Sequence, residues 1–323
     1  MKEYAFGIDL GGTTAKIGLF KTTGELLEKW EVPTDTSNAG EHILENLAAA
    51  VQGKMQEKGL AAAQVEGVGV GVPGPVLDSR IVPIICANLG GWGKHNVAEE
   101  LSTMLGGIRV LVGNDANVAA LGEIWMGAAK GCRSAVMVTL GTGVGGGVII
   151  NGKIYSGFNS FGGELGHTVI VYNGEPCPCG RRGCLESYAS ATALIKQTRE
   201  SMKNHTESRL WKICPNISEI NGKTAFDAMR AGSKAGAEVV NRYINYLGCG
   251  LTNFINVFQP EMLLIGGGVS KEGETLLDPL RKILAVETYG SDMDAPKTKI
   301  GVCTLRNDAG TIGAANLHRL YES

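Results

Sequence analysis

The pattern that most constrains the fold occurs twice, each time as an apolar run, a turn of glycine and threonine, and a second apolar run. The first copy covers residues 3–20 and the second residues 135–150, and the two match in pattern without a gap when Leu140 is placed over Leu10. Short apolar runs on either side of a glycine turn predict a β-hairpin. A repeat of this kind predicts two halves of similar architecture, each presenting a glycine-lined turn.

Predicted strands and helices alternate along the rest of the chain, which predicts an α/β fold. Strands are expected over residues 65–72, 108–112 and 262–265, and helices over residues 41–58, 97–105, 118–129, 240–258 and 310–321. A chain of 323 residues is long enough for two domains. We expect a small α/β domain over residues 1–115, completed by a C-terminal helix over residues 306–323. A large α/β domain would then cover residues 116–305.

Charge and hydropathy exclude several classes of protein. The 30 basic and 32 acidic residues leave a net charge of -2, which argues against binding to nucleic acid or to an anionic membrane surface. No segment resembles a signal peptide, and no run approaches the roughly 20 apolar residues of a membrane span. We therefore expect a cytoplasmic protein whose eight cysteines stay reduced.

Both glycine turns have the composition of a nucleotide phosphate site. Phosphates are bound by several backbone N–H groups with no side chain in the way, and threonine hydroxyls add donors. Neither turn is a Walker A loop, and each returns as a strand where a Rossmann fingerprint would continue as a helix. Tight hairpins without a ligand are the alternative, but two such turns in equivalent places favour a nucleotide. The residues assigned to ATP here are Asp9, Gly11, Gly12, Thr13, Thr14, Lys16, Gly141, Thr142 and Gly143.

Asp9 ends the first predicted strand and would lie beside the phosphates. A buried carboxylate is costly unless a cation is near, and Mg²⁺ bound through water is the natural partner. The alternative is an aspartate that caps the hairpin. Lys16 could reach a phosphate, or it could be solvated in the returning strand.

One histidine and three cysteines are close in sequence: His167, Cys177, Cys179 and Cys184. This set is sufficient for a closed tetrahedral zinc site, and zinc with four protein ligands is structural because no position is left for water. Thiolates this close together would repel each other without a metal ion. Three unlinked thiols are the alternative, which the spacing and the reducing compartment disfavour.

Three segments resemble motifs of the sugar kinase, hexokinase and actin superfamily. The two glycine turns resemble its phosphate-1 and phosphate-2 motifs, and residues 264–270 resemble its adenosine motif. The resemblance implies two ribonuclease-H-like domains with a cleft between them that holds ATP and a sugar. It also implies that Gly266, Gly267 and Gly268 lie against the adenosine.

The segment 163–167, Gly-Glu-Leu-Gly-His, and the run Cys-x-Cys-Gly-x-x-Gly-Cys-Leu-Glu that starts at Cys177 are similar to the signature of the ROK family. The run 184–190 resembles the glucokinases of that family. The resemblance implies an ATP-dependent kinase that uses Mg²⁺, phosphorylates the 6-hydroxyl of a hexose and forms a homodimer or homotetramer. Glucose is the expected substrate. The alternatives are N-acetylglucosamine, N-acetylmannosamine, mannose, allose and fructose as substrate, and polyphosphate as phosphoryl donor.

A hexose pocket needs carboxylates and amides, because these pair with several hydroxyls. Glu164 and Glu186 flank the metal cluster, so the metal loop would hold them in place, and His167 could bind zinc through one ring nitrogen and a sugar hydroxyl through the other. The alternative is that Glu164 and Glu186 are ordinary exposed glutamates without a functional role. The resemblance implies instead that both contact the sugar. The sugar-site candidates are Asn88, Asn114, Asp115, Glu164, His167 and Glu186. We further expect residues 71–75 and 88–92 to line the mouth of the cleft.

Asn114 and Asp115 stand where a strand gives way to a helix. Position alone favours helix capping. The resemblance implies instead that Asp115, in the run Gly-Asn-Asp-Ala-Asn, is the catalytic base, which accepts the proton of the primary hydroxyl as its oxygen attacks the γ-phosphate. A sugar-sensing regulatory protein is the non-enzymatic alternative. The ROK repressors carry a helix-turn-helix domain ahead of the first phosphate strand, for which we expect no room here.

Overall fold

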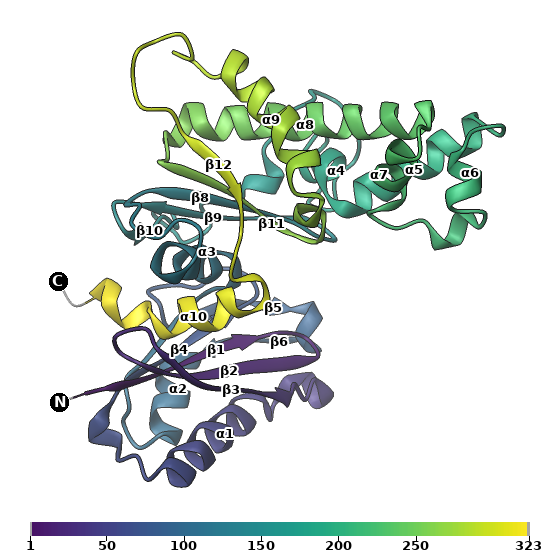
Figure 1. Ribbon diagram of the computed structural model, residues 1–323. Coiled ribbons are helices and arrows are strands. Elements are labelled where there is room, and N and C mark those ends of the chain that lie inside the picture. The colour runs from purple at the N-terminus through teal and green to yellow at the C-terminus, as the bar shows by residue number, and fades with distance from the viewer. Residues whose placement is uncertain (1, 322–323) are drawn as a thin grey trace. The chain divides into compact units, whose positions relative to one another are not determined.

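The computed structural model describes residues 2–321, and these form two compact units (Figure 1). The first unit runs to Arg133, resumes over Gly147–Gly163 and ends with the segment that begins at Thr304. The second unit comprises Ser134–Gly146 and Glu164–Cys303.

The first unit contains a five-stranded sheet in the order β3-β2-β1-β4-β7. Its strands are β1 (Tyr4–Leu10), β2 (Thr14–Lys21), β3 (Leu26–Pro33), β4 (Val65–Val72) and β7 (Val110–Asn114). The hairpins β1–β2 and β2–β3 are antiparallel, whereas β4 is parallel to both β1 and β7. A separate two-stranded ribbon joins β5 (Ile81–Cys86) to β6 (Trp92–Asn96).

Helices cover both faces of this sheet, as Figure 1 shows. They are α1 (Ile43–Lys58), α2 (Val97–Met104), α3 (Asp115–Met126) and α10 (Ala309–Ala315). Side chains alternate along β1, so Phe6 and Ile8 join the core shared with α1 and α2. The opposite face lies against α10, and a Cβ at Gly69 would be 1.8 Å from the carbonyl oxygen of Ala314. Only glycine permits this close approach.

The second five-stranded sheet has the order β10-β9-β8-β11-β12. Its strands are β8 (Ala135–Leu140), β9 (Val144–Ile150), β10 (Lys153–Ile154), β11 (Met262–Gly267) and β12 (Lys299–Val302). β11 is parallel to both β8 and β12. This order repeats that of the first sheet strand for strand, with β8 and β9 in the places of β1 and β2. The predicted internal repeat is therefore confirmed.

The helices of the second unit include one long central helix. They are α4 (Glu186–Ala189), α5 (Ala191–Asn204), α6 (Leu210–Ile213), α7 (Thr224–Arg230), α8 (Lys234–Phe258) and α9 (Glu274–Glu287). The predicted apolar face of α8 is buried, with Tyr243, Leu247 and Leu251 all fully enclosed. The predicted α/β architecture is confirmed.

The described units differ from the predicted domains in two main respects: Gly147–Gly163 belongs to the first unit, although we placed it in the large domain, and so does α3, although we placed the boundary at Asp115. The reason is the packing of α3 on α10, where a Cβ at Gly313 would lie 1.7 Å from the carbonyl oxygen of Val118. Helix α3 also begins and ends three residues earlier than predicted. Among the described residues, no helix is long and apolar enough to cross a membrane.

Candidate functional site

The first glycine turn joins β1 to β2 and is closed by its own backbone. The N–H of Gly11 donates to the carbonyl of Thr14 at 3.1 Å, and the Thr34 hydroxyl donates to the carbonyl of Gly11 at 2.7 Å. A Cβ at Gly12 would lie 2.5 Å from the carbonyl oxygen of Asn88. The turn and the Asn88 backbone, predicted separately to bind ATP and sugar, are therefore neighbours. Thr34 was not predicted, because nothing in its local sequence marks it.

Asp9 and Lys16 face each other across the β1–β2 hairpin. Burial raises the pKa of the Asp9 carboxyl, and the charge of Lys16 only partly opposes this shift. The carboxylate also abuts α10, since a Cβ at Gly310 would lie 2.6 Å from its Cγ. An ionised Asp9 therefore lacks full compensation, which is the environment that a cation would relieve.

Asn114 is the N-cap of α3, as its position suggested. Its Oδ1 accepts the N–H of Asn117 at 3.1 Å, and its Nδ2 donates to the carbonyl of Gly74 at 3.1 Å. Asp115 is the exposed first residue of the helix, and its Oδ1 accepts from the N–H of Ala116 at 2.7 Å and from Nδ2 of Asn114 at 3.0 Å. Asn114 thus makes the capping contact through its Oδ1 and holds the neighbouring carboxylate through its Nδ2.

The segment 71–75 lies beside Asn114 through this Gly74 contact. Trp92, by contrast, does not line an opening: it is 1% exposed and stacks on His95 with ring centroids 5.2 Å apart. The expectation for Trp92 was wrong, because its large apolar surface is better used in the core under the β5–β6 ribbon.

The second glycine turn joins β8 to β9 and is tied to helices that follow the metal loop. The N–H of Gly141 donates to the carbonyl of Gly143 at 3.0 Å, and the N–H of Ala191 donates to the carbonyl of Gly141 at 2.8 Å. The N–H of Val144 donates to Oε2 of Glu186 at 2.9 Å. Glu186, predicted for the sugar, is therefore in contact with the predicted phosphate turn.

The predicted adenosine segment lies next to the same turn. Gly267 is paired with Leu140 in the parallel β11–β8 ladder, and Leu140 directly precedes the turn. A Cβ at Gly267 would lie 2.3 Å from the carbonyl oxygen of Leu140, and its φ of 82° is one that favours glycine. The structure thus brings Gly266, Gly267 and Gly268 together with Gly141, Thr142 and Gly143 at the carboxyl ends of adjacent strands.

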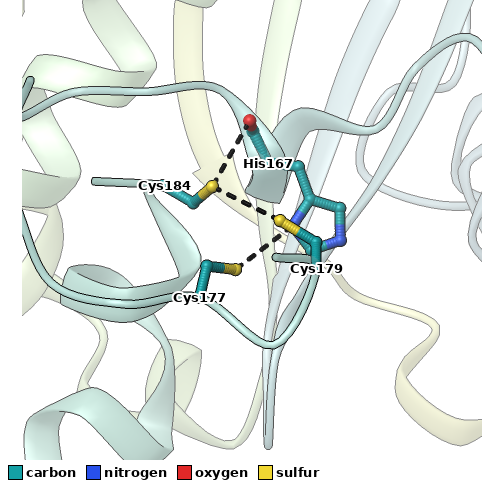
Figure 2. A group of neighbouring side chains, drawn as sticks. All are labelled: His167, Cys177, Cys179 and Cys184. Carbon is teal, nitrogen blue, oxygen red and sulfur yellow. Dashed lines mark hydrogen bonds between the residues drawn. The ribbon is translucent and has the colours of Figure 1, made fainter. Parts of the chain in front are cut away.

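The four predicted metal ligands converge at one point (Figure 2). The ligand atoms of His167, Cys177, Cys179 and Cys184 all lie within 4.8 Å of one another. Sγ of Cys177 is 3.6 Å from Nδ1 of His167, and Sγ of Cys179 is 3.7 Å from Sγ of Cys184. A zinc tetrahedron has edges of about 3.6 Å between nitrogen and sulfur and about 3.8 Å between two sulfurs. The set fits a tetrahedral zinc ion.

The thiols in this cluster have opposed pKa shifts. Burial raises the pKa of Cys184 to about 12, whereas the backbone N–H of Arg181 lowers the pKa of the exposed Cys179. A cation at the centre would make both thiolates favourable. His167 directs Nδ1 into the cluster, so Nε2 is the ring nitrogen left for another partner. Glu164 is exposed, and the backbone carbonyl of Glu164 accepts the N–H of His167 at 3.1 Å.

Comparison with known proteins identifies the class. Residues 5–320 match the ROK family, and the chain belongs to that family. A glucokinase of Halalkalibacterium halodurans is 38% identical over 98% of this chain and 95% of its own.

Solved structures agree with this assignment. A ROK family glucokinase of Streptomyces griseus, in complex with glucose and AMPPNP, is 33% identical with a TM-score of 0.76 over 98% of this chain and 99% of its own. A ROK hexokinase of Thermus thermophilus is 32% identical with a TM-score of 0.80 over 97% of this chain and 96% of its own. The two-unit α/β fold is thus the actin-like ATPase fold of these kinases.

Proposed function

We propose that this protein is an ATP-dependent glucokinase, which transfers the γ-phosphoryl group of ATP to the 6-hydroxyl of glucose. The observation that carries the proposal is the similarity to glucokinases along nearly the whole chain, at 38% identity for the Halalkalibacterium halodurans enzyme. The Streptomyces griseus relative was solved with glucose and AMPPNP, a sugar and an ATP analogue that together match this reaction.

Asp115 is the proposed catalytic base. It accepts the proton of the sugar 6-hydroxyl as that oxygen attacks the γ-phosphorus and the bond to the leaving ADP oxygen breaks. A carboxylate is a weak base for an alcohol, so positioning provides most of the rate. The N-cap Asn114 supports this role, because its Nδ2 holds Oδ1 of Asp115 at 3.0 Å.

The two glycine turns are the proposed phosphate sites, with the threonine hydroxyls and Lys16 as further donors, and Gly266, Gly267 and Gly268 the adenosine site. Mg²⁺ bound with ATP would neutralise phosphate charge. Asp9 is the residue that fits such a cation, because burial already raises the pKa of its carboxyl and leaves its ionised form costly.

The proposed hexose ligands are Asn88, Asn114, Asp115, Glu164, His167 and Glu186. A structural zinc ion held by His167, Cys177, Cys179 and Cys184 would fix the segment that carries three of these ligands. The support is the convergence of the four ligand atoms within 4.8 Å. A homodimer or homotetramer and a cytoplasmic location, where ATP is abundant, complete the proposal.

The test is release of ADP by the purified protein with ATP and Mg²⁺, with and without each of a panel of hexoses. Glucose is expected to give the highest kcat/KM. A higher value with N-acetylglucosamine, N-acetylmannosamine or another hexose would keep the kinase but move its substrate. Sugar binding without any sugar-dependent ADP release would show a regulatory protein and overturn the proposal.

A further inference from the structure

The carboxylate of Glu186 lies between the metal cluster and the second glycine turn. Its Oε2 accepts the N–H of Val144 at 2.9 Å, and its Oε1 is 3.8 Å from Sγ of Cys177. The approach to the turn is close, since a Cβ at Gly143 would lie 2.3 Å from Oε2. A glycine at 143 is therefore required for Glu186 to reach the turn, and not only for a ligand to reach the backbone.

The chain between the metal and this carboxylate has little freedom. Cys184 is a ligand of the cluster, Leu185 is fully buried, and Glu186 is the first residue of α4. Leu185 packs against α8, where a Cβ at Gly250 would lie 2.7 Å from its methyl carbons. Coordination of a metal ion at Cys184 would therefore fix the position of the Glu186 backbone.

The helix that follows makes a second tie to the same turn. The N–H of Ala191, the first residue of α5, donates to the carbonyl of Gly141 at 2.8 Å. The two ends of the turn are thus held by residues that directly follow the metal loop. Since the amides of Gly141 and Val144 donate to protein oxygens, the amides of Thr142 and Gly143 are the candidates for a phosphate.

We propose that Glu186 is a positioning residue for the nucleotide: it holds the turn 141–144 in shape for a phosphate, and the metal cluster acts on ATP binding through it. This inference rests on the proposed function, which assigns the turn to ATP. In this arrangement Oε2 of Glu186 holds the turn and Oε1 faces the metal cluster. The cluster then supports the nucleotide site as well as the sugar ligands.

The test is binding of AMPPNP with Mg²⁺ and without sugar to the metal-loaded full chain, measured by titration calorimetry. Glu186→Ala removes the acceptor of the Val144 N–H and is expected to weaken AMPPNP binding about tenfold. Glu186→Gln is expected to bind within about twofold of the wild type, because its amide oxygen can accept the Val144 N–H. Its NH₂ group would then face Cys177.

The matched control is Glu175→Ala. This carboxylate lies in the same loop region but is exposed and pairs with Lys196 at 2.7 Å, so AMPPNP binding should not change. Unchanged binding in Glu186→Ala, or an equal loss in Glu186→Gln, would overturn the inference. Thermal unfolding of each variant separates a loss of local shape from a loss of fold.

Removal of the metal by a chelator tests the second half of the proposal. AMPPNP binding to the wild type should weaken. The affinity of the already weakened Glu186→Ala for AMPPNP should change less than about twofold, because metal removal and the substitution both act through the contact of Glu186 with the turn. Equal losses in both proteins would show that the metal acts independently of Glu186. A wild type that binds AMPPNP but phosphorylates no sugar would refute the proposed function. The comparison of AMPPNP binding between the wild type and Glu186→Ala would still test the role of Glu186.

Discussion

Replacement of Glu123, a fully buried carboxylate in α3, should destabilise the first unit more than any exposed charge does. Its Oε1 accepts the N–H of Leu305 at 2.8 Å. Its Oε2 accepts the N–H of Ala128 at 2.8 Å and both the N–H and the hydroxyl of Thr304 at 3.2 Å. One side chain thus holds the segment after α3 and the segment that leads into α10.

Glu123→Ala leaves three backbone N–H groups without this acceptor. These hydrogen bonds are partly buried, so each donor left without its acceptor should cost about 1–2 kcal/mol, and relief of the buried carboxylate offsets part of the sum, which gives a net loss of about 3 kcal/mol. Glu123→Gln keeps one acceptor oxygen but directs an NH₂ group at the other donors, and it should cost about 2 kcal/mol.

Urea unfolding followed by far-ultraviolet circular dichroism measures both changes in the free energy of unfolding. If the two units unfold in separate transitions, the transition that shifts in these variants is the one compared. The control is Glu45→Ala: this carboxylate is 62% exposed and pairs with the exposed His42, so its removal should cost under about 0.5 kcal/mol. A loss below about 1 kcal/mol in Glu123→Ala would refute the reasoning, because the three donors would then have found other partners.

Three further outcomes follow from the structure. Asp9→Asn should stabilise the ligand-free protein at pH 7: burial raises the pKa of this carboxyl, so wild-type stability falls as pH rises from about 4 through the raised native pKa. Urea unfolding at pH 4 and pH 7 checks this, and an unchanged difference between the two pH values in the variant would contradict it. Cys179→Ser should lower the bound zinc and the melting temperature, both measured on one preparation, and full zinc content would remove Cys179 from the ligand set. Gly69→Ala should cost about 3 kcal/mol or prevent folding, because its Cβ would meet the Ala314 carbonyl at 1.8 Å; near-normal stability would show that α10 can move aside.

Features that depend on neighbours in sequence could be predicted. The glycine turns were found because a strand, a turn and a returning strand are consecutive, and the metal ligands because three of the four lie within eight residues. The N-cap role of Asn114 followed from its place between a strand and a helix. Each of these is a local requirement of backbone hydrogen bonding or metal geometry.

Features that depend on distant partners could not be predicted. Glu123 looks like any helical glutamate, since its acceptor role is set by Thr304 and Leu305, more than 180 residues away. The contact of Glu186 with Val144 joins residues 42 positions apart.

The β5–β6 ribbon is a local feature that was missed for a different reason. Its register contains an irregularity between Val82 and Ile85, which breaks the simple alternation of a strand.

The catalytic role of Asp115 is tested most directly by the turnover of Asp115→Asn with ATP and glucose. The new amide can keep the contacts with Ala116 and Asn114 through its own oxygen, so the fold and the affinity for glucose should persist. We expect kcat to fall about a thousandfold or more, since a general base contributes a factor of about 10²–10⁴. A kcat within about tenfold of the wild type, in a variant that still binds glucose, would contradict the account.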